Sequence, residues 1–237
     1  MGLTLTPQSL QRSQSLQEQA YQALRTSILS GTLFPGQRLV ETQLAQMLQV
    51  SRTPIREALR QLQQSNLAVI DAHGVMRVAL FTSTDAMQLY ECRIALEQVS
   101  VSEACRYATD DQLKQISALI QKAEKLLSAK PTKLTNAQLL DVDYQFHRAI
   151  AQASRNEWLV SLLDQLFDKM MLLRIQTMHN NPAVLEIRLE HRQVYDAIAG
   201  RDAQKAVAMT KAHLIASQAR VVRELEQLQQ QISAAHS

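Results

Sequence analysis

The sequence predicts a mainly α-helical chain in which an N-terminal winged helix-turn-helix is followed by an all-helical bundle. Two observations support this prediction. The first 80 residues contain three helical patterns and then two β-prone runs, and three of the ten glycines and prolines fall at 31–36. After residue 82 the helical periodicity continues almost without interruption, because only Pro131, Pro182 and Gly200 break it.

Composition favours a protein of the cytoplasm with no membrane association. The chain has 237 residues and is 46% hydrophobic, enough to bury one sizeable core or two modest ones. No apolar run approaches the roughly 20 residues that cross a bilayer. Residues 1–15 are polar and rich in Gln and Ser, without the apolar segment of a signal peptide, so we predict a flexible N-terminal tail there.

The excess positive charge is confined to the first third of the chain. Residues 1–80 contain seven arginines and four acids, whereas residues 81–237 contain 18 basic and 18 acidic side chains. The net charge of +3 therefore belongs to the N-terminal region. A small bias of this kind indicates only weakly that this region binds a polyanion.

We expect three helices and a hairpin before residue 81. The first helix is predicted by apolar residues four positions apart, which share one helical face: Leu16, Ala20, Leu24 and Ile28. After the turn GTLFPG, we predict helices at 40–48 and 51–67, and β-strands at 68–71 and 75–80 joined by Ala72, His73 and Gly74.

The helix at 51–67 has the features of a recognition helix. Ser51 is a suitable N-cap, and Pro54 lies in the first turn, where its missing N–H costs nothing. The apolar residues of this helix share one face, which we expect to point inward: Ile55, Leu59 and Leu62. Three other side chains at the helix start then point outward: Arg52, Thr53 and Arg56.

These outward side chains suit DNA. A helix in the major groove presents its N-terminal residues to base edges, and arginine pairs in bidentate fashion with guanine. Arg52 and Arg56 share one face, and Thr53 could reach a phosphate or a thymine methyl group. The hairpin tip, His73 and Gly74, could enter the neighbouring minor groove. The alternative for the two arginines, taken alone, is an ordinary solvated helix face.

From residue 83 onward we predict six helices, which form a bundle. Capping residues support several ends: Asp110 and Asn156 as helix starts, and Gly200 followed by Asp202 as a stop and restart. The predicted helices lie at about 84–108, 110–129, 136–153, 156–178, 183–199 and 202–231.

One aspartate and three histidines in this region have the spacing of a metal site. Asp143 and His147 are four residues apart and share a helical face. His191 and His213 are equidistant from the turn after Gly200, so antiparallel helices would bring them to the same height. The four side chains can converge in the bundle core. Nitrogen and carboxylate ligands suit zinc, the expected ion, with nickel and manganese as alternatives.

Each of these residues also has a simpler interpretation. A single histidine on an apolar helix is usually structural, and Asp143 with His147 could be a surface pair. Glu190 is adjacent to His191 but is expected to point to another face. The remaining candidates, His179 and His236, are expected to be solvated.

The segment PGQRLVETQLAQMLQVSRTPIREALRQLQ at 35–63 resembles the signature of the GntR family of bacterial regulators. The resemblance covers roughly the first 80 residues. It implies that Arg52 and Arg56 read bases. It also implies contacts to the DNA backbone from Ser51, Thr53, His73 and Gly74.

Two features differ from many relatives. Thr42 follows Glu41 at the start of the second helix, where a basic residue is common. The wing VIDAHGVMRV contains one acid and one arginine in place of an arginine-rich loop. Both differences bear on the strength of the phosphate contacts.

The remainder of the chain resembles the FCD ligand-binding domain of the FadR-type branch, in YECRIALE (90–97), DVDYQFHRAIAQASRN (141–156) and EHRQVYDAIAGRDAQKAVAMTKAHL (190–214). The resemblance covers residues 84–225. It implies metal ligation with one or two positions open to water or an effector carboxylate. The implied ligands are Asp143, His147, His191 and His213.

The same resemblance implies that Arg93 binds the carboxylate of an effector, since a guanidinium binds carboxylates in bidentate fashion. The alternative is an ordinary surface pair between Arg93 and Glu97, four residues apart. Arg148 and Arg174 are further candidates that the sequence does not rank.

We therefore expect no enzyme but a ligand-responsive repressor, with residues 16–80 binding DNA and residues 84–231 binding a metal and a small organic acid. A homodimer on a pseudo-palindromic DNA operator is expected, because the two DNA-binding domains of a dimer match two half-sites. One alternative is a metal sensor without an organic effector. A metal-dependent hydrolase is another, although no general base is evident and residues 35–63 would be unexplained.

Overall fold

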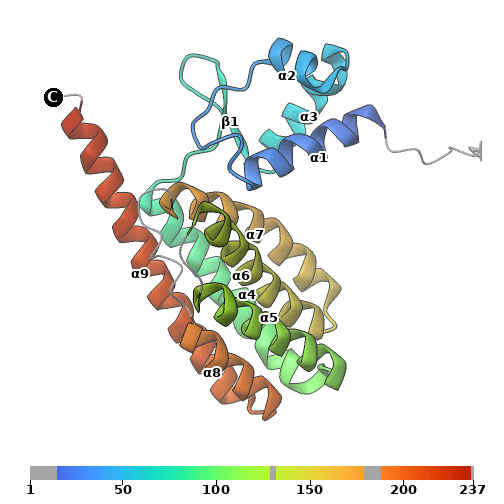
Figure 1. Cartoon of the computed structure of the whole chain (residues 1–237), viewed down its shortest axis with the longest axis vertical. Coiled ribbons are helices and arrows are strands. Elements are labelled where there is room, and N and C mark those ends of the chain that lie inside the picture. Colours follow the sequence, from blue (N-terminus) through green and yellow to red (C-terminus); the bar gives the residue numbers. More distant parts are fainter. Residues whose placement is uncertain (1–14, 129–131, 179–187, 236–237) are drawn as a thin grey trace, which may run out of the picture.

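A computed structural model describes residues 15–128, 132–178 and 188–235. Figure 1 shows a small N-terminal part, with three helices and a hairpin, above a bundle of long helices. The final helix runs along the bundle and continues beyond it beside the N-terminal part. The fold is the mainly α-helical architecture that the sequence predicts.

Helices α1 (Leu16–Leu29), α2 (Glu41–Leu48) and α3 (Arg52–Gln64) enclose one apolar core. Leu24, Ile28, Ile55 and Leu62 are buried within it. Leu16 was expected on the same inward stripe, but it is the first residue of α1 and is 57% exposed.

The recognition helix α3 ends three residues earlier than predicted. Asn66 has a φ of 58°, in the left-handed region that asparagine tolerates better than most residues, so the helix cannot continue through it. Leu67 after it is fully buried and leads into the hairpin. Helix α2 likewise ends at a left-handed residue, Gln49, which has a φ of 56° and begins the turn to α3.

The hairpin consists of β1 (Ala68–Ile70) and β2 (Met76–Val78), which pair in antiparallel fashion with Val69 opposite Arg77. These strands are shorter than predicted. Asp71 organises the turn between them: its N–H donates to the carbonyl of Val75, and its own carbonyl accepts from the N–H of Gly74, each at 2.9 Å. Its carboxylate accepts hydrogen bonds from the backbone of His73 and Val75, each at 2.9 Å.

The bundle contains a long first helix and a long last helix that pack against each other, with four helices between them in the chain. Its elements are α4 (Ser83–Tyr107), α5 (Asp110–Ser128), α6 (Lys133–Ala153), α7 (Glu157–Met178), α8 (Arg188–Ala199) and α9 (Ala203–Ala235).

The predicted helix starts at Asp110, Asn156 and Asp202 are confirmed, although only the last two residues act as caps. Asn156 and Asp202 accept hydrogen bonds from the backbone N–H three residues ahead, at 3.0 and 2.9 Å. Asp110 is already the first residue of α5, so the capping hydroxyl comes from Thr109, which accepts a hydrogen bond from Gln112. Ser51 occupies the N-cap position of α3, but its side chain makes no capping hydrogen bond.

Helix α7 connects the bundle with the N-terminal part. Its Leu172 is fully buried in the N-terminal core, and its Asp168 accepts hydrogen bonds from Arg25 of α1. Gln176 binds both the N–H and the carbonyl group of Phe81, in the segment between the hairpin and α4, at 3.0 and 2.9 Å. Helix α7 therefore contributes core packing, an ion pair and hydrogen bonds to the junction between the two parts.

Some predictions concern residues that the structure does not describe. The predicted tail at 1–15 lies outside the described residues except for Ser15, whose hydroxyl caps α1. His179, His236 and the predicted start of α8 at 183 also lie outside them. Within the described ranges, none of the helices combines the length and apolarity needed to cross a bilayer.

Candidate metal centre and nucleic-acid interface

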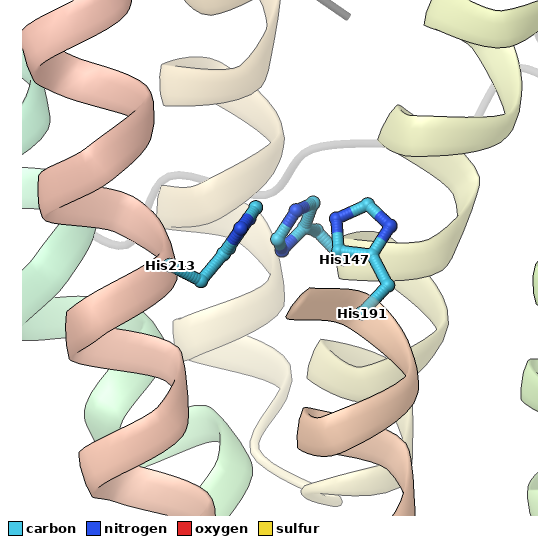
Figure 2. Close-up of side chains that lie close together, drawn as sticks. All are labelled: His147, His191 and His213. Atoms are coloured by element: carbon cyan, nitrogen blue, oxygen red, sulfur yellow. The ribbon is translucent and has the colours of Figure 1, made fainter. Parts of the chain in front are cut away.

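Three helices bring the four predicted metal ligands together inside the bundle. Asp143 and His147 lie one turn apart on α6, His191 lies on α8, and His213 lies on α9. Ligand atoms of the three histidines lie within 4.8 Å of one another, and Figure 2 shows their rings gathered between the helices. The Oδ1 atom of Asp143 lies 3.3 Å from His191 Nε2 and 3.8 Å from His147 Nε2.

The residues fit a divalent metal ion. The three histidines are buried, and the side chain of Asp143 is 12% exposed. Three inward atoms, Asp143 Oδ1, His147 Nε2 and His191 Nε2, are buried without a hydrogen-bond partner among the described residues. An unpaired buried polar atom costs about 1–3 kcal/mol. A cation bound among these atoms would remove that cost, and imidazole with carboxylate suits zinc, nickel or manganese.

Two glutamates hold histidines of this cluster from behind. Glu97 of α4 accepts a hydrogen bond from His147 Nδ1 at 2.6 Å, and Glu190 of α8 accepts one from His213 Nδ1 at 2.8 Å. A proton fixed on Nδ1 leaves Nε2 free for a ligand. The expectation that Glu190 points to another face is wrong, because its carboxylate reaches across to α9.

The charges of the cluster favour cation binding. Burial lowers the pKa of His191 well below its usual range and lowers that of His213 to about 4, so both rings are neutral at pH 7. Burial alone would raise the pKa of Asp143, but its interactions with His147, His191 and the guanidinium groups of Arg174 and Arg93 together outweigh burial and hold the pKa well below its usual range. Neutral imidazoles and an ionised carboxylate are the forms that bind metals.

Arg93 lies next to the cluster, on α4. Its Nε donates to Glu97 at 2.6 Å, and its guanidinium lies 5.6 Å from the centroid of the Phe167 ring. Both Arg93 and Glu97 are 3% exposed, so the alternative of a surface pair is wrong, although the pair itself forms. A small cavity of about 20 Å³ is lined by Arg93, Asp143 and Arg174.

The two further arginine candidates, Arg148 and Arg174, lie in different surroundings. Arg148 is paired with Asp164 of α7 at 2.8 Å, and both side chains are about one third exposed. Arg174 is buried and donates to Ser217 of α9 at 2.6 Å. Of the two additional arginines, only Arg174 lies beside the metal cluster.

The predicted DNA-contacting residues of α3 are exposed at its N-terminal end: Ser51, Arg52, Thr53 and Arg56. The two arginines share one partner that the sequence analysis did not assign. The carboxylate of Glu41, the first residue of α2, accepts hydrogen bonds from Arg52 at 3.2 Å and from Arg56 at 3.1 and 3.3 Å. The two guanidinium groups are therefore held side by side.

The wing tip is exposed and closely turned. His73 and Gly74 are both accessible, and Gly74 has a φ of 76° with open space around the position of a Cβ atom. Arg77, the only arginine of the wing, donates to Asp71 at 2.6 Å and to the carbonyl of Gly36 at 3.3 Å. That arginine braces the hairpin.

A winged helix-turn-helix with arginines at the start of its recognition helix, followed by a bundle with a buried ligand cluster, defines a DNA-binding regulator with a second, helical domain. The chain belongs to the GntR family of bacterial regulatory proteins, whose domain matches residues 16–78, and residues 88–216 match the FCD domain. It is therefore a transcriptional regulator.

Several known proteins are similar over most of the chain. YdhC, an uncharacterised HTH-type transcriptional regulator of Bacillus subtilis, is 29% identical over 195 residues, covering 82% of this chain and 86% of YdhC. The structure of McbR/YncC from E. coli has a TM-score of 0.73 at 22% identity, covering 89% of this chain and 98% of that one.

The metal-free FCD domain of another regulator matches with a TM-score of 0.51 at 22% identity, over 63% of this chain and 99% of that domain. At such identities the two structural matches support the fold alone.

Proposed function

We propose that this protein is a repressor whose affinity for DNA responds to a small carboxylate bound at a metal ion in the helical domain. The observation that carries this proposal is the convergence of Asp143 and three histidines inside the bundle, with the guanidinium of Arg93 beside them. Residues 16–80 would form the DNA-binding domain and residues 84–231 the sensory domain.

In this proposal the protein binds a pseudo-palindromic operator as a homodimer. Arg52 and Arg56 read base edges in the major groove, and they are exposed at the correct end of α3 for that role. Contacts to the DNA backbone come from Ser51, Thr53, His73 and Gly74. The open, glycine-containing wing tip supports a close approach to the minor groove.

Zinc is the ion we favour, held by Asp143, His147, His191 and His213, with nickel and manganese as alternatives. When bound, the ion supplies a Lewis acid with one or two positions for water or an effector oxygen. The protein contributes orientation, because Glu97 and Glu190 fix two of the imidazoles. The Arg93 guanidinium would then bind the effector carboxylate.

A metal sensor without an organic effector is a second candidate, and one observation favours it. The cavity beside Arg93 measures about 20 Å³, which is room for a water molecule. A carboxylic acid would need Arg93 or its neighbours to move.

The test begins with selection of DNA sequences from a random duplex library by the full chain. Affinity for the selected duplex is then measured with zinc-loaded protein, chelator-treated protein, and zinc-loaded protein with a panel of small mono- and dicarboxylic acids. We expect at least one acid to change the affinity only when zinc is present. If zinc alone changes it and no acid acts, the metal sensor is correct. If neither acts, the sensory role of this site is wrong.

A further inference from the structure

A cleft of about 410 Å³ separates α3 from the wing. Arg56 and Arg60 line it from α3, Gly74 and Met76 line it from the wing, and Arg38 lines it from the segment before α2. The backbone of Arg38 forms an isolated β-bridge with Arg77, so this segment lies against the edge of the hairpin. The sensory function described above makes no use of this cleft.

DNA geometry determines what would cross the cleft. If α3 enters the major groove and the wing tip enters the adjacent minor groove, the two elements lie on opposite sides of one sugar-phosphate strand. That strand separates the two grooves, so it must pass between α3 and the wing. The ligand expected in the cleft is therefore a run of phosphodiester groups.

The arginines around the cleft differ in their partners. Arg52 and Arg56 share the carboxylate of Glu41, and Arg77 is paired with Asp71. Arg38 and Arg60, by contrast, are exposed and have no ion pair or side-chain hydrogen bond among the described residues. Their positive charges are available to a ligand.

We propose that the cleft between α3 and the wing is a phosphodiester-binding site in which Arg38 and Arg60 clamp the DNA strand between the two grooves. This inference rests on the proposed DNA-binding mode and adds to it. It also explains how a wing without free basic residues can hold DNA, because the charge comes from the segments on either side. Arg60 lies one turn beyond Arg56 on the same helical face, which suits a backbone contact beside a base contact.

The test compares full-length R38Q and R60Q with wild type on two duplexes of equal length, one selected from a random library and one unrelated. We expect each substitution to weaken binding to both duplexes by a similar factor, about fivefold to tenfold at ~0.1 M salt. The slope of log K against log salt concentration should decrease in magnitude by about one per bound subunit. The variants R38K and R60K, which keep the charge, should retain most of the affinity.

R106Q is the matched control, because Arg106 is exposed on α4, far along the chain from the cleft, and its loss changes the net charge equally. We expect R106Q to bind as wild type does. The cleft proposal is wrong if R38Q and R60Q keep the wild-type salt slope, if they match R106Q, or if they weaken binding only to the selected duplex. If wild type itself enriches no sequence, the DNA-reading function fails instead. Unchanged circular dichroism and melting temperature would show that the variants are folded.

Discussion

Glu97 contacts both halves of the candidate sensory site. One carboxylate oxygen accepts a hydrogen bond from Arg93, and the other accepts one from His147, both at 2.6 Å. Burial by itself would raise the pKa of Glu97, but the Arg93 guanidinium and the hydrogen bond from His147 lower it to about 2, so the group is ionised at pH 7. In the proposed site, the glutamate would therefore position the metal-ligating His147 and the effector-binding Arg93 at once.

Substitution of Glu97 by Gln should lower zinc affinity about tenfold to a hundredfold, because loss of a carboxylate partner of a metal-ligating histidine has that effect. Competition of the folded protein with a zinc-binding dye measures it. E91Q is the control, since Glu91 is exposed on the same helix. An affinity for zinc within twofold of wild type in E97Q would contradict the positioning role.

Glu41 has a corresponding position at the DNA-binding surface. Because its carboxylate fixes the two guanidinium groups, E41Q should lower the preference for a selected duplex over an unrelated one, by about tenfold. Affinity for the unrelated duplex should stay equal or rise, since a negative charge is removed near phosphates. Equal preference in E41Q and wild type, measured by fluorescence anisotropy, would show that Glu41 does not position the arginines.

The R56A variant should lose about tenfold to a hundredfold in affinity for the selected duplex, measured in the same way.

At the scale of elements, α7 is the structural connection between the site and the DNA-binding part. Arg174 on this helix lies beside the metal cluster, whereas Asp168, Leu172 and Gln176 contact the N-terminal part or the segment that follows it. A shift of α7 caused by a ligand would change the orientation of the N-terminal, DNA-binding part. Coupling of this kind requires that the two parts move with one element.

The D168N variant tests this connection. It should reduce the effect of zinc on the affinity for a selected duplex by about threefold or more, while zinc affinity stays the same. D164N is a matched control, because Asp164 also lies on α7 but is paired with Arg148 of α6, within the bundle. Equal zinc responses in D168N, D164N and wild type would show that the Asp168 contact of α7 does not couple the zinc site to DNA affinity.

The element boundaries show what periodicity can and cannot predict. The ends of the helices were predicted to within about four residues, and α3 was predicted three residues too long. A left-handed asparagine ended that helix, and hydrophobic periodicity carries no signal for such a residue. The hairpin strands were also predicted too long. Asp71 and Val75 still share a backbone hydrogen bond, but they belong to the turn that the Asp71 carboxylate closes.

At the scale of the whole molecule, the sequence could predict which ligands meet but not what surrounds them. The i, i+4 spacing and the symmetric distance from the turn at 200–202 were sufficient to bring Asp143 and the three histidines together. The contacts of Glu97 with His147 and of Glu190 with His213 were missed because each joins two helices, and the packing angle of those helices is not encoded in any local spacing. The same applies to Arg38, which is near α3 only through the fold.

Removal of the metal should lower the stability of the entire chain, since the cluster contains buried polar atoms that a cation would satisfy. At a zinc concentration about 1,000 times the Kd, linkage stabilises the folded state by about 4 kcal/mol, and the melting temperature should rise by about 10 °C. Thermal unfolding of chelator-treated protein with and without added zinc measures this shift. The H73A variant, which lacks the exposed wing histidine, should keep the same rise in melting temperature. If zinc no longer raised the melting temperature of H73A, zinc would be binding outside the helical cluster.

In the proposed function, a metal ion is held in a helical domain separate from the domain that binds DNA. The most direct test is elemental analysis of the purified full chain and of H191A after dialysis, together with affinity for a selected duplex. We predict about one metal ion per wild-type chain, almost none in H191A, and specific DNA binding retained in both. Stoichiometric metal in H191A, or a metal-free wild type that still cannot take up zinc, would contradict the account.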